Sequence, residues 1–533
     1  MMNLVIVGGG TAGWMAAGYL KKTNPNFSIT LIESPAIPKI GVGESVTPHV
    51  AAFFNDLGVP VEHWMQHTGS VYKYANKFTD WSDSTKERGE YFSFTYTTNI
   101  NALYRDIQHV TSFEEMAQYG NYKTTDAFLA LKKEGKIGRF DTHFDTQYHY
   151  MENNVAPFDG KTYLLNPLYS WSQHINADLA AEYIRDNIAK PLGVRHIQAK
   201  VQNVVHEGDN ITSLELDNGQ SVVADLFIDA SGFNKVLVKA LGWAEQSYRQ
   251  NPVNAAWVCQ VDYDDYETEM VNYTQSIAKD YGWLFKIGLY HRMGTGYCFS
   301  RDYVSEEQAL EQYLSYVPNA KRRDPKLIKW TPQRLVEPAK GNCVAIGLSC
   351  GFVEPMEANA LYIIVSSIRK LNTVFERAKG SKQLNFKQYN EEIAYAIDDI
   401  ADFIKVHYSL SNQNKNDMWK DMISLGVRDN HLDLVVDKYL GEKNNMQAAW
   451  NGNTLFPDYM WAQLASAWDL VDDKFPVKAA PDITLLLSKL FFTNQNLKHE
   501  IISRVCPNNF QWLKSNIFGG MMPNEWENKF LGH

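Results

Sequence analysis

The N-terminal stretch NLVIVGGGTAGWMAAGYLKK, residues 3–22, places a glycine-rich turn between an apolar strand and a helix. Gly8, Gly10 and Gly13 fit the pattern in which glycines permit a tight turn, close approach of a diphosphate and close helix–strand packing. Glu33 ends the next apolar run, where a carboxylate can accept hydrogen bonds from ribose hydroxyls. Strand, turn, helix, strand and acid in this order predict a nucleotide-binding βαβ unit. The alternative is a tight turn without a ligand.

Two later apolar runs favour a flavin over a nicotinamide nucleotide. ADLFIDASGF spans residues 224–233, and GNCVAIGLSCGFVEP spans residues 341–355. A glycine motif followed by such strands resembles flavin monooxygenase-type chains, and no second convincing GxGxxG pattern follows residue 13. The predicted fold class is α/β, with an FAD-binding Rossmann-like core of flavin monooxygenase type, additional β-sheet and a mostly helical C-terminal cap. Asp229 is expected to orient a strand end beside the FAD.

The composition argues against several classes of function. The 533 residues carry a formal net charge of -10, which disfavours a nucleic-acid or anionic-membrane surface. Five scattered cysteines without a CxxC pair indicate reduced thiols rather than a disulfide framework or a zinc site. No apolar run is long enough to span a membrane, and no leader precedes the first strand. We therefore predict a cytoplasmic protein without membrane or nucleic-acid partners.

A series of motifs along the chain occurs in the same order as in one enzyme family. The series comprises GGGTAGWMAA (8–17), KIGVGESVTPHVAAFFNDLGV (39–59), YKYANKFTDW (72–81), SQHINADLAAEYIR (172–185), DLFIDASGF (225–233), HRMGTGYCFS (291–300) and IGLSCGFVEPMEANALYII (346–364). With these motifs the chain resembles the flavin-dependent tryptophan halogenases. The ordered series is more specific than any one of its members.

The resemblance implies a halogenation reaction that uses reduced FAD, dioxygen and a halide ion. A separate NAD(P)H-dependent flavin reductase would supply reduced flavin, and the halide would be oxidised to hypohalous acid. Lys77, taken as the essential lysine of the family, would deliver this species to an electron-rich aromatic ring. Glu357 is implied as the carboxylate that polarises the electrophile or takes the ring proton. Backbone N–H groups of Asn359 and Ala360 are the implied halide contacts.

The resemblance also assigns residues to the cofactor and the substrate. The implied FAD contacts are Gly8, Gly10, Thr11, Ala12, Gly13, Glu33, Val42, Ser45, Val201, Asp229, Leu348 and Leu361. The implied aromatic contacts to the substrate are Phe94 and Trp461. The residue types suit the chemistry, because desolvation lowers the pKa of a pocket lysine and a nearby carboxylate raises it. Holding hypohalous acid at one amine beside a fixed ring makes a general oxidant regioselective by positioning.

One segment departs from the aromatic signature of the family. The usual WxWxIP is GWLFKIGLYHR here, with Trp283 kept, Phe285 at the second Trp and Gly288 at the Pro. The signature is thought to separate the substrate from the oxygenated flavin. We expect this separation to be largely kept, because two aromatic side chains remain.

Two further departures concern the halide and the substrate. The residues after the matched glutamate, 358–360, are Ala-Asn-Ala in place of the usual Ser-Thr-Gly. We infer a preference for bromide or iodide over chloride. The insertion at residues 90–106 falls where the family's tryptophan-stacking residues would lie. Residues that would recognise the ammonium and carboxylate of a free amino acid are not evident. The expected substrate is therefore an indole, a phenol or another electron-rich aromatic compound rather than free tryptophan.

The pattern of residues also predicts how the chain is organised. An FAD-binding halogenase core is expected over residues 1–375, with a loop-rich insertion at about 85–165. A helical cap that contributes to the substrate pocket is expected over residues 376–533. Within the core, helices are predicted at 49–67 and 176–194.

Two other functions remain open at the level of the sequence. A flavin-dependent aromatic monooxygenase would share FAD and dioxygen but would need neither Lys77 nor a halide. A catalytically inactive, flavin-binding member of the family would bind FAD and form no product. The sequence leaves homo-oligomerisation open.

Overall fold

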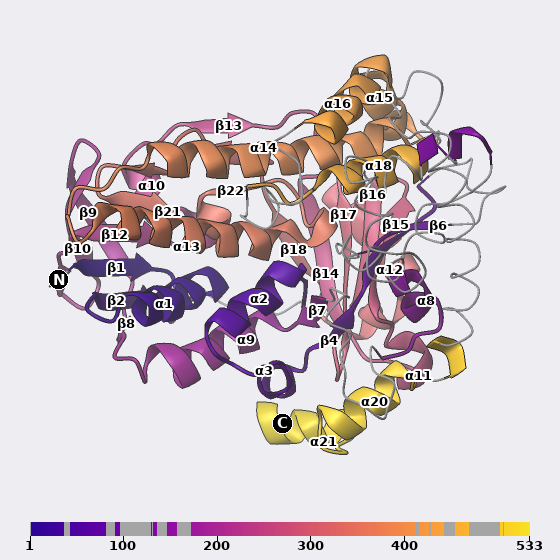
Figure 1. Ribbon diagram of the computed structural model, residues 1–533, viewed down its shortest axis with the longest axis horizontal. Helices are drawn as coiled ribbons and strands as arrows, with labels where there is room; N and C mark the ends of the chain where they lie inside the picture. Colours follow the sequence, from indigo (N-terminus) through magenta and orange to yellow (C-terminus); the bar gives the residue numbers. More distant parts are fainter. Residues whose placement is uncertain are drawn as a thin grey trace, which may run out of the picture.

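Two large sheets lie towards opposite ends of the molecule, and two long helices run between them (Figure 1). The structure is a computed structural model, which describes residues 2–36, 43–81, 91–95, 129–130, 132–135, 146–156, 172–411, 415–425, 428–441, 453–467, 502–504 and 506–532. The long helices are α13 (Asn359–Ala378) and α14 (Lys387–Ser409). They connect the sheet that carries the glycine turn with the sheet that carries Lys77.

The first large sheet is mainly parallel and is centred on the N-terminal strand. Its strand order is β20-β21-β12-β1-β2-β8, and β1 (Asn3–Val7) pairs in parallel with both neighbours. The helix α1 (Thr11–Thr23) follows β1 directly and buries small residues and Trp14. The other strands are β2 (Ser28–Glu33), β8 (Arg195–Gln198), β12 (Leu226–Asp229), β20 (Ala339–Lys340) and β21 (Cys343–Ala345). The predicted βαβ unit is therefore present, and its binding of a nucleotide stays a prediction.

The second large sheet is mixed and has the order β18-β14-β17-β16-β15-β5-β6. Its strands are β5 (Ala75–Thr79), β6 (Tyr91–Thr95), β14 (Ala255–Val261), β15 (Tyr273–Lys279), β16 (Gly282–Gly288), β17 (Met293–Phe299) and β18 (Lys326–Lys329). Three smaller sheets have three strands each. One contains β3 (Glu44–Ser45), β7 (Ser172–Ile175) and β4 (Val71–Lys73), and a second contains β9 (Val201–Glu207), β10 (Asn210–Leu216) and β11 (Ser221–Val222). The third contains β13 (Glu245–Ser247), β19 (Gln333–Leu335) and β22 (Gly351–Phe352). The chain thus passes at Tyr74 from β4 in one sheet to β5 in another.

The shorter helices differ in their bounds from the sequence expectations. The helix predicted over residues 49–67 is two helices, α2 (Pro48–Asp56) and α3 (Val61–Thr68). Gly58 adopts a positive φ of 70° between them, and Pro60 immediately precedes α3, so the chain turns there. The helix predicted over 176–194 ends earlier, as α9 (Ala177–Ile184) followed by the π-helical turn η2 (Arg185–Ala189). The remaining short helices of the core are α8 (Thr146–Glu152), α10 (Val236–Ala240), α11 (Tyr266–Glu269) and α12 (Glu306–Tyr316).

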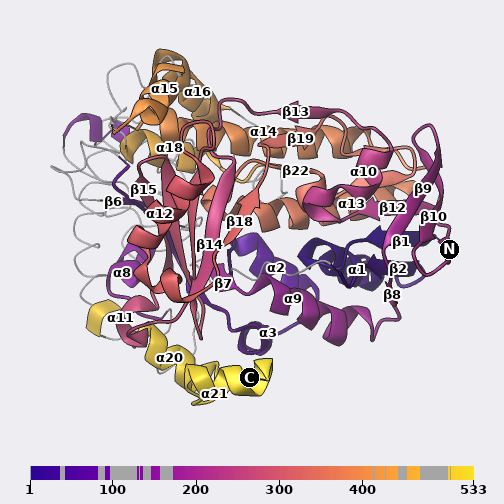
Figure 2. The same cartoon turned by 180° about the vertical axis from the view of Figure 1, so that it is seen from behind.

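The described C-terminal elements are helical, as the sequence predicts, but they occupy two separate places (Figure 2). The first group lies at one end of α14 and contains α15 (Asp417–Leu425), α16 (Arg428–Leu440) and α18 (Asp458–Ala467). The second group, α20 (Asn509–Asn516) and α21 (Pro523–Leu531), lies on the other side, against α3. There the buried Trp526 donates from Nε1 to the carbonyl oxygen of Gln66 at 2.7 Å. The division of the chain at residue 375 stays a prediction, and that residue lies within α13.

The hydropathy of the helices bears on membrane insertion. Among the described residues, no helix is long and apolar enough to cross a membrane. The apolar side chains instead form a buried core that extends through both large sheets and the long helices.

Candidate active site

The backbone of the glycine turn explains why glycine stands at its ends. Gly8 has a φ of 121°, and a Cβ there would lie 2.2 Å from the carbonyl oxygen of Ala230. A Cβ on Gly13 would lie 1.9 Å from the carbonyl oxygen of Gly8. At Gly10, in contrast, a Cβ would meet no described atom within 4 Å. The turn is therefore closed by protein at Gly8 and Gly13 and open to a ligand at Gly10.

Alanine substitutions at Gly8 and Gly10 are expected to have different effects. Gly8→Ala should lower stability, and Gly10→Ala should weaken nucleotide binding. Gly8→Ala should lower the free energy of unfolding by about 1–3 kcal/mol through backbone strain and by about 1–3 kcal/mol through overlap with Ala230. Gly10→Ala should leave it unchanged, because Gly10 has a φ of -78° and open surroundings. The added methyl should nevertheless weaken FAD binding. Denaturant unfolding and FAD titration of both variants check this, and full FAD affinity in Gly10→Ala would contradict it.

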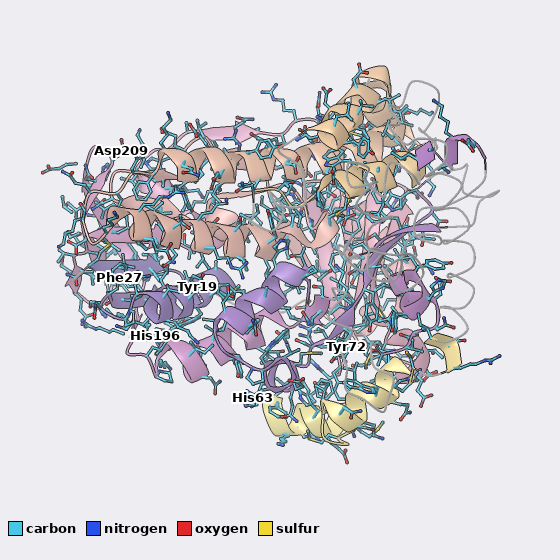
Figure 3. All side chains as sticks on the ribbon, viewed as in Figure 1. Tyr19, Phe27, His63, Tyr72, His196 and Asp209 are labelled. Carbon is cyan, nitrogen blue, oxygen red and sulfur yellow. The ribbon has the colours of Figure 1, made fainter. Side chains whose placement is uncertain are left out.

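Glu33 lies at the end of β2 against the glycine turn. A Cβ on Gly9 would lie 2.1 Å from the carboxyl carbon of Glu33. The Oε2 atom of Glu33 lies 2.9 Å from Nε2 of His196, the residue labelled beside α1 in Figure 3. The His196 ring packs edge-on against Trp14 of α1. The structure thus keeps the Glu33 carboxylate at the strand edge where the sequence predicts a ribose.

A turn late in the sequence lies between the start of α1 and α13. A Cβ on Gly347 would lie 3.1 Å from Cβ of Ala12 and 3.1 Å from Cγ1 of Ile364. Gly347 opens the turn η5 (Gly347–Ser349), which also carries Leu348. Thr11 begins α1, and its hydroxyl donates to a backbone carbonyl of α9. Residues far apart in the sequence are therefore brought together around one end of α1.

Asp229 has a structural role that is visible in its hydrogen bonds. Its Oδ1 accepts from the Ser231 backbone N–H at 3.0 Å and from the Ser349 hydroxyl at 2.9 Å. Its Oδ2 accepts from the backbone N–H groups of Leu237 at 2.7 Å and Val238 at 3.1 Å. The fully buried carboxylate joins β12, η5 and the start of α10. It therefore orients the strand end, as expected.

The other predicted flavin contacts are dispersed over several elements. Ser45 in β3 shares a 2.8 Å hydrogen bond with the hydroxyl of Thr274. Val201 begins β9, and Leu361 is buried in the first turn of α13. Val42 lies outside the described residues. No geometry here places any of these four beside a flavin, and their role stays a prediction.

Lys73 is a fully buried lysine at the end of β4. Its exposed fraction is 0%, and Nζ lies 3.3 Å from the backbone carbonyl oxygen of Val46, to which it donates. Burial lowers the pKa of Lys73 to about 7, and the charge of Glu357 opposes this shift. An unperturbed lysine has a pKa of about 10.4. The amine and ammonium forms of Lys73 are therefore both accessible near neutral pH.

Glu357 stands on a left-handed turn immediately before α13. Its φ is 63°, and that of the following Ala358 is 58°. Two non-glycine residues in succession in this region are strained. The side chain of Asn359 secures the turn by donating to the carbonyl oxygens of Glu354 at 2.8 Å and Met356 at 2.7 Å. The turn directs Glu357 into the interior, where it is 5% exposed.

The carboxylate of Glu357 is bounded by side chains from three other elements. Asn76 of β5 donates from Nδ2 to Oε2 at 2.5 Å. His407 of α14 places Nε2 3.5 Å from Oε1. Lys73 of β4 interacts with the same carboxylate through its charge. The arrangement is a buried acid–base cluster at the junction of two sheets and the two long helices.

Lys77 does not belong to this cluster, contrary to the sequence prediction. Its Nζ lies 3.3 Å from Oε1 of Glu152 and 5.1 Å from the centre of the Tyr273 ring. Its side chain is 17% exposed, whereas that of Lys73 is buried. Side chains alternate along a strand, so Asn76 of β5 faces Glu357 while its neighbour Lys77 faces the other side. The prediction for Lys77 therefore passes to Lys73, which the sequence reasoning overlooked.

A second buried carboxylate anchors the turn that carries Glu357. Oε1 of Glu354 accepts from Trp283 Nε1 at 3.0 Å and from the Tyr408 hydroxyl at 3.0 Å. Burial raises the pKa of Glu354 to about 8, and both hydrogen bonds oppose the shift. Glu354 thereby ties the turn to β16 and α14. These contacts fix the shape of the turn, and Trp283 takes part in them.

The family model described as tryptophan halogenase matches residues 3–480. The chain belongs to the tryptophan halogenase family. It is 32% identical over 443 residues to the tryptophan 7-halogenase RebH of Lentzea aerocolonigenes, with 80% of each chain covered. It is likewise 32% identical over 446 residues to the tryptophan 6-halogenase SttH of Streptomyces toxytricini, covering 80% of this chain and 82% of that one.

The architecture agrees with this assignment. The crystal structure of SttH matches with a TM-score of 0.81 at 27% identity, covering 98% of this chain and 100% of that chain. The structure of Tar14, a tryptophan C-6 flavin-dependent halogenase from taromycin biosynthesis, matches with a TM-score of 0.80 at 25% identity, covering 97% of this chain and 100% of that one. The predicted family, fold class and enzyme class are confirmed.

A flavin-dependent halogenase needs FAD, dioxygen and a halide, and the chain offers suitable groups for the first and the last. The open side at Gly10 fits a diphosphate. Asn359 and Ala360, the predicted halide residues, begin α13. The first N–H groups of a helix have no acceptor within the helix and suit an anion. The side chain of Asn359 is used within the turn, so a halide contact there would be to the backbone.

The structure describes the side chain of only one of the two predicted substrate residues. Phe94 lies on β6 opposite Asn76, and its side chain is outside the described part. Trp461 of α18 is fully buried, with its ring centre 4.9 Å from that of Phe403. The ring centre of Phe403 in turn lies 5.0 Å from the ring centre of His407. Trp461 is thus linked to the acid–base cluster through one intervening ring, and its contact with a substrate stays a prediction.

Proposed function

We propose that this halogenase uses FAD, dioxygen and a halide to halogenate an electron-rich aromatic compound, such as an indole or a phenol, at Lys73 and Glu357. The observation that carries the proposal is a fully buried lysine whose charge interacts with a buried carboxylate. A lysine whose pKa is strongly shifted by burial beside a specific carboxylate is a candidate for a functional group. The pair lies where α13 begins, and Ile364 of the same helix packs against Gly347, which also borders Ala12 of α1.

The chemistry divides between the cofactor and the chain. Reduced FAD, supplied by a separate NAD(P)H-dependent flavin reductase, provides with dioxygen the oxidising power that turns halide into hypohalous acid. The Lys73 amine holds the hypohalous acid, and its ammonium form gives a proton to the departing hydroxide. A pKa of about 7 allows both forms at neutral pH. Glu357 takes the proton from the ring carbon that gains the halogen, so the sum is arene plus hypohalous acid giving haloarene plus water.

Two features support an aromatic substrate and a selective halide site. Aromatic rings border the cluster at His407. The ring centres of Phe78 and Trp81 lie 5.0 Å and 6.1 Å from the centre of the His407 ring. The halide would meet backbone N–H groups at the start of α13, next to Ala358 and Ala360. We propose that these alanines favour bromide or iodide over chloride.

The test supplies the intact protein with FAD, NADH, a general flavin reductase and air. Indole and a panel of phenols and heteroaromatics are offered with chloride, bromide or iodide separately, and products are identified by mass spectrometry. Halogen mass shifts, largest with bromide or iodide, are the expected result. A gain of one oxygen without halogen would instead establish an aromatic monooxygenase. FAD binding with no product would indicate an inactive family member, and equal turnover of all halides or a chloride preference would overturn the halide proposal alone.

A further inference from the structure

His407 is a buried histidine whose tautomer is fixed by its own helix. Its Nδ1 lies 2.8 Å from the backbone carbonyl oxygen of Phe403, one turn earlier in α14. A carbonyl oxygen only accepts hydrogen bonds, so Nδ1 must carry the proton of a neutral ring. The lone pair of that ring is then on Nε2, and Nε2 is the atom nearest Glu357.

With the neutral ring, Nε2 of His407 and Oε1 of Glu357 are two acceptors that face each other. Nε2 lies 3.5 Å from Oε1, which is longer than the range of about 2.7–3.2 Å for an N–H···O bond. The other carboxylate oxygen, Oε2, is already held by the amide of Asn76 at 2.5 Å. The charge of Lys73 offsets that of the carboxylate in the resting state. A proton that arrives at Glu357 is therefore directed to Oε1, beside the basic nitrogen of His407.

The surroundings of His407 keep this position dry. The ring lies among Phe78 and Trp81, at the end of β5, and Phe403 of its own helix. The side chain itself is fully buried. Water has little access to a group buried among aromatic rings, so it cannot readily act as the proton donor or acceptor. Proton transfer there depends on how the neighbouring side chains are placed.

We propose that His407 accepts from Glu357 the proton that leaves the aromatic ring. The inference rests on the proposed halogenation. The C–H bond of the halogenated ring breaks, its electron pair returns to the ring, and the proton binds Glu357. The O–H bond at Oε1 then breaks as an N–H bond forms at Nε2, which gives an imidazolium beside a regenerated carboxylate. The cycle closes when the His407 imidazolium gives up its proton and the Lys73 amine takes one up, which restores both groups. Because His407 acts through Glu357, it is a positioning residue.

The test uses competition between indole and indole deuterated at its ring carbons, with bromide and the complete reductase system. Efficient removal of the ring proton gives equal amounts of the two brominated products, since attack on the ring then decides the outcome. In His407→Gln, which can neither accept nor carry a proton, deprotonation becomes limiting and the light product should dominate. The rate should fall by about 10²-fold, the lower end of what a positioned acid or base contributes. His431→Gln, a buried histidine of α16 that contacts Ser409, is the matched control and should behave as wild type.

The outcomes separate this inference from the proposed function. No brominated indole from the wild type would overturn the proposed function and the inference together. Bromination with the same isotope ratio and rate in His407→Gln and wild type would overturn the inference alone. Should His407→Gln not fold, nitrogen-15 NMR of histidine in the wild type decides. A neutral Nδ1–H form of His407, altered in Glu357→Gln, is expected, and an imidazolium in the resting enzyme would overturn the inference.

Discussion

Lys73→Met is expected to abolish halogenation while leaving FAD binding intact. Methionine keeps a straight, unbranched stem in the buried position of Lys73 but removes the amine that would hold hypohalous acid and donate a proton. The rate of haloarene formation should fall by about 10²- to 10⁴-fold, the range over which a positioned acid or base acts. Mass spectrometry of the products and titration with FAD, both on the same preparation, measure the two effects separately.

The matched control is Lys77→Met, four residues along the same segment. Lys77 pairs with Glu152 in a partly exposed position, and such pairs contribute only about 0–1 kcal/mol to stability. The rate of haloarene formation by Lys77→Met should stay near that of the wild type. The reverse result, with Lys77→Met inactive and Lys73→Met active, would restore the assignment made from the sequence motif and contradict the one made from burial.

The two lysines show why a motif can fail to identify the side chain that matters. Residues four apart on one continuous strand would point to the same face, so alternation alone does not separate Lys73 from Lys77. In the structure the chain changes sheets at Tyr74, and the two lysines enter different surroundings. The available signal was the run VYKYA, in which Lys73 is flanked on both sides by apolar and aromatic residues. Lys77, in contrast, follows Asn76.

The glycine turn was predictable because its constraints are local. Gly8, Gly13 and Glu33 lie within one βαβ unit, and each is explained by a contact inside that unit or at its edge. The break between α2 and α3 also had a local signal, since Gly58 and Pro60 interrupt an otherwise helical pattern. That signal was outweighed by the apolar spacing on either side.

The cluster around Glu357 was only partly predictable because its members meet through tertiary packing. Asn76 is 281 positions from Glu357 in the sequence, and the two meet because β5 passes the turn before α13. His407 arrives from α14, and no spacing in the sequence relates it to Lys73 or Asn76. Family resemblance indicated Glu357, but the side chains that surround it could be identified only from the fold.

Glu357→Gln is expected to remove most of the activity without disturbing the structure of the site. The amide oxygen can accept from Asn76 as Oε2 does, and the amide nitrogen can donate to Nε2 of His407. The negative charge is lost, so the ring proton has no acceptor. Because the charge of Glu357 raises the pKa of Lys73, its loss should also leave the lysine mainly as the neutral amine. Halogenation should fall by about 10²- to 10⁴-fold, with FAD affinity unchanged.

Glu357→Ala distinguishes the loss of charge from the loss of geometry. Alanine leaves the buried amide of Asn76 without its acceptor, which costs about 1–3 kcal/mol of unfolding free energy. Glu357→Gln should therefore match the wild type more closely than Glu357→Ala in denaturant unfolding, while both variants lose activity. If Glu357→Gln instead kept the wild-type rate, the carboxylate would be acting through its hydrogen bonds alone. Proton transfer would then have to be assigned to another group of the cluster.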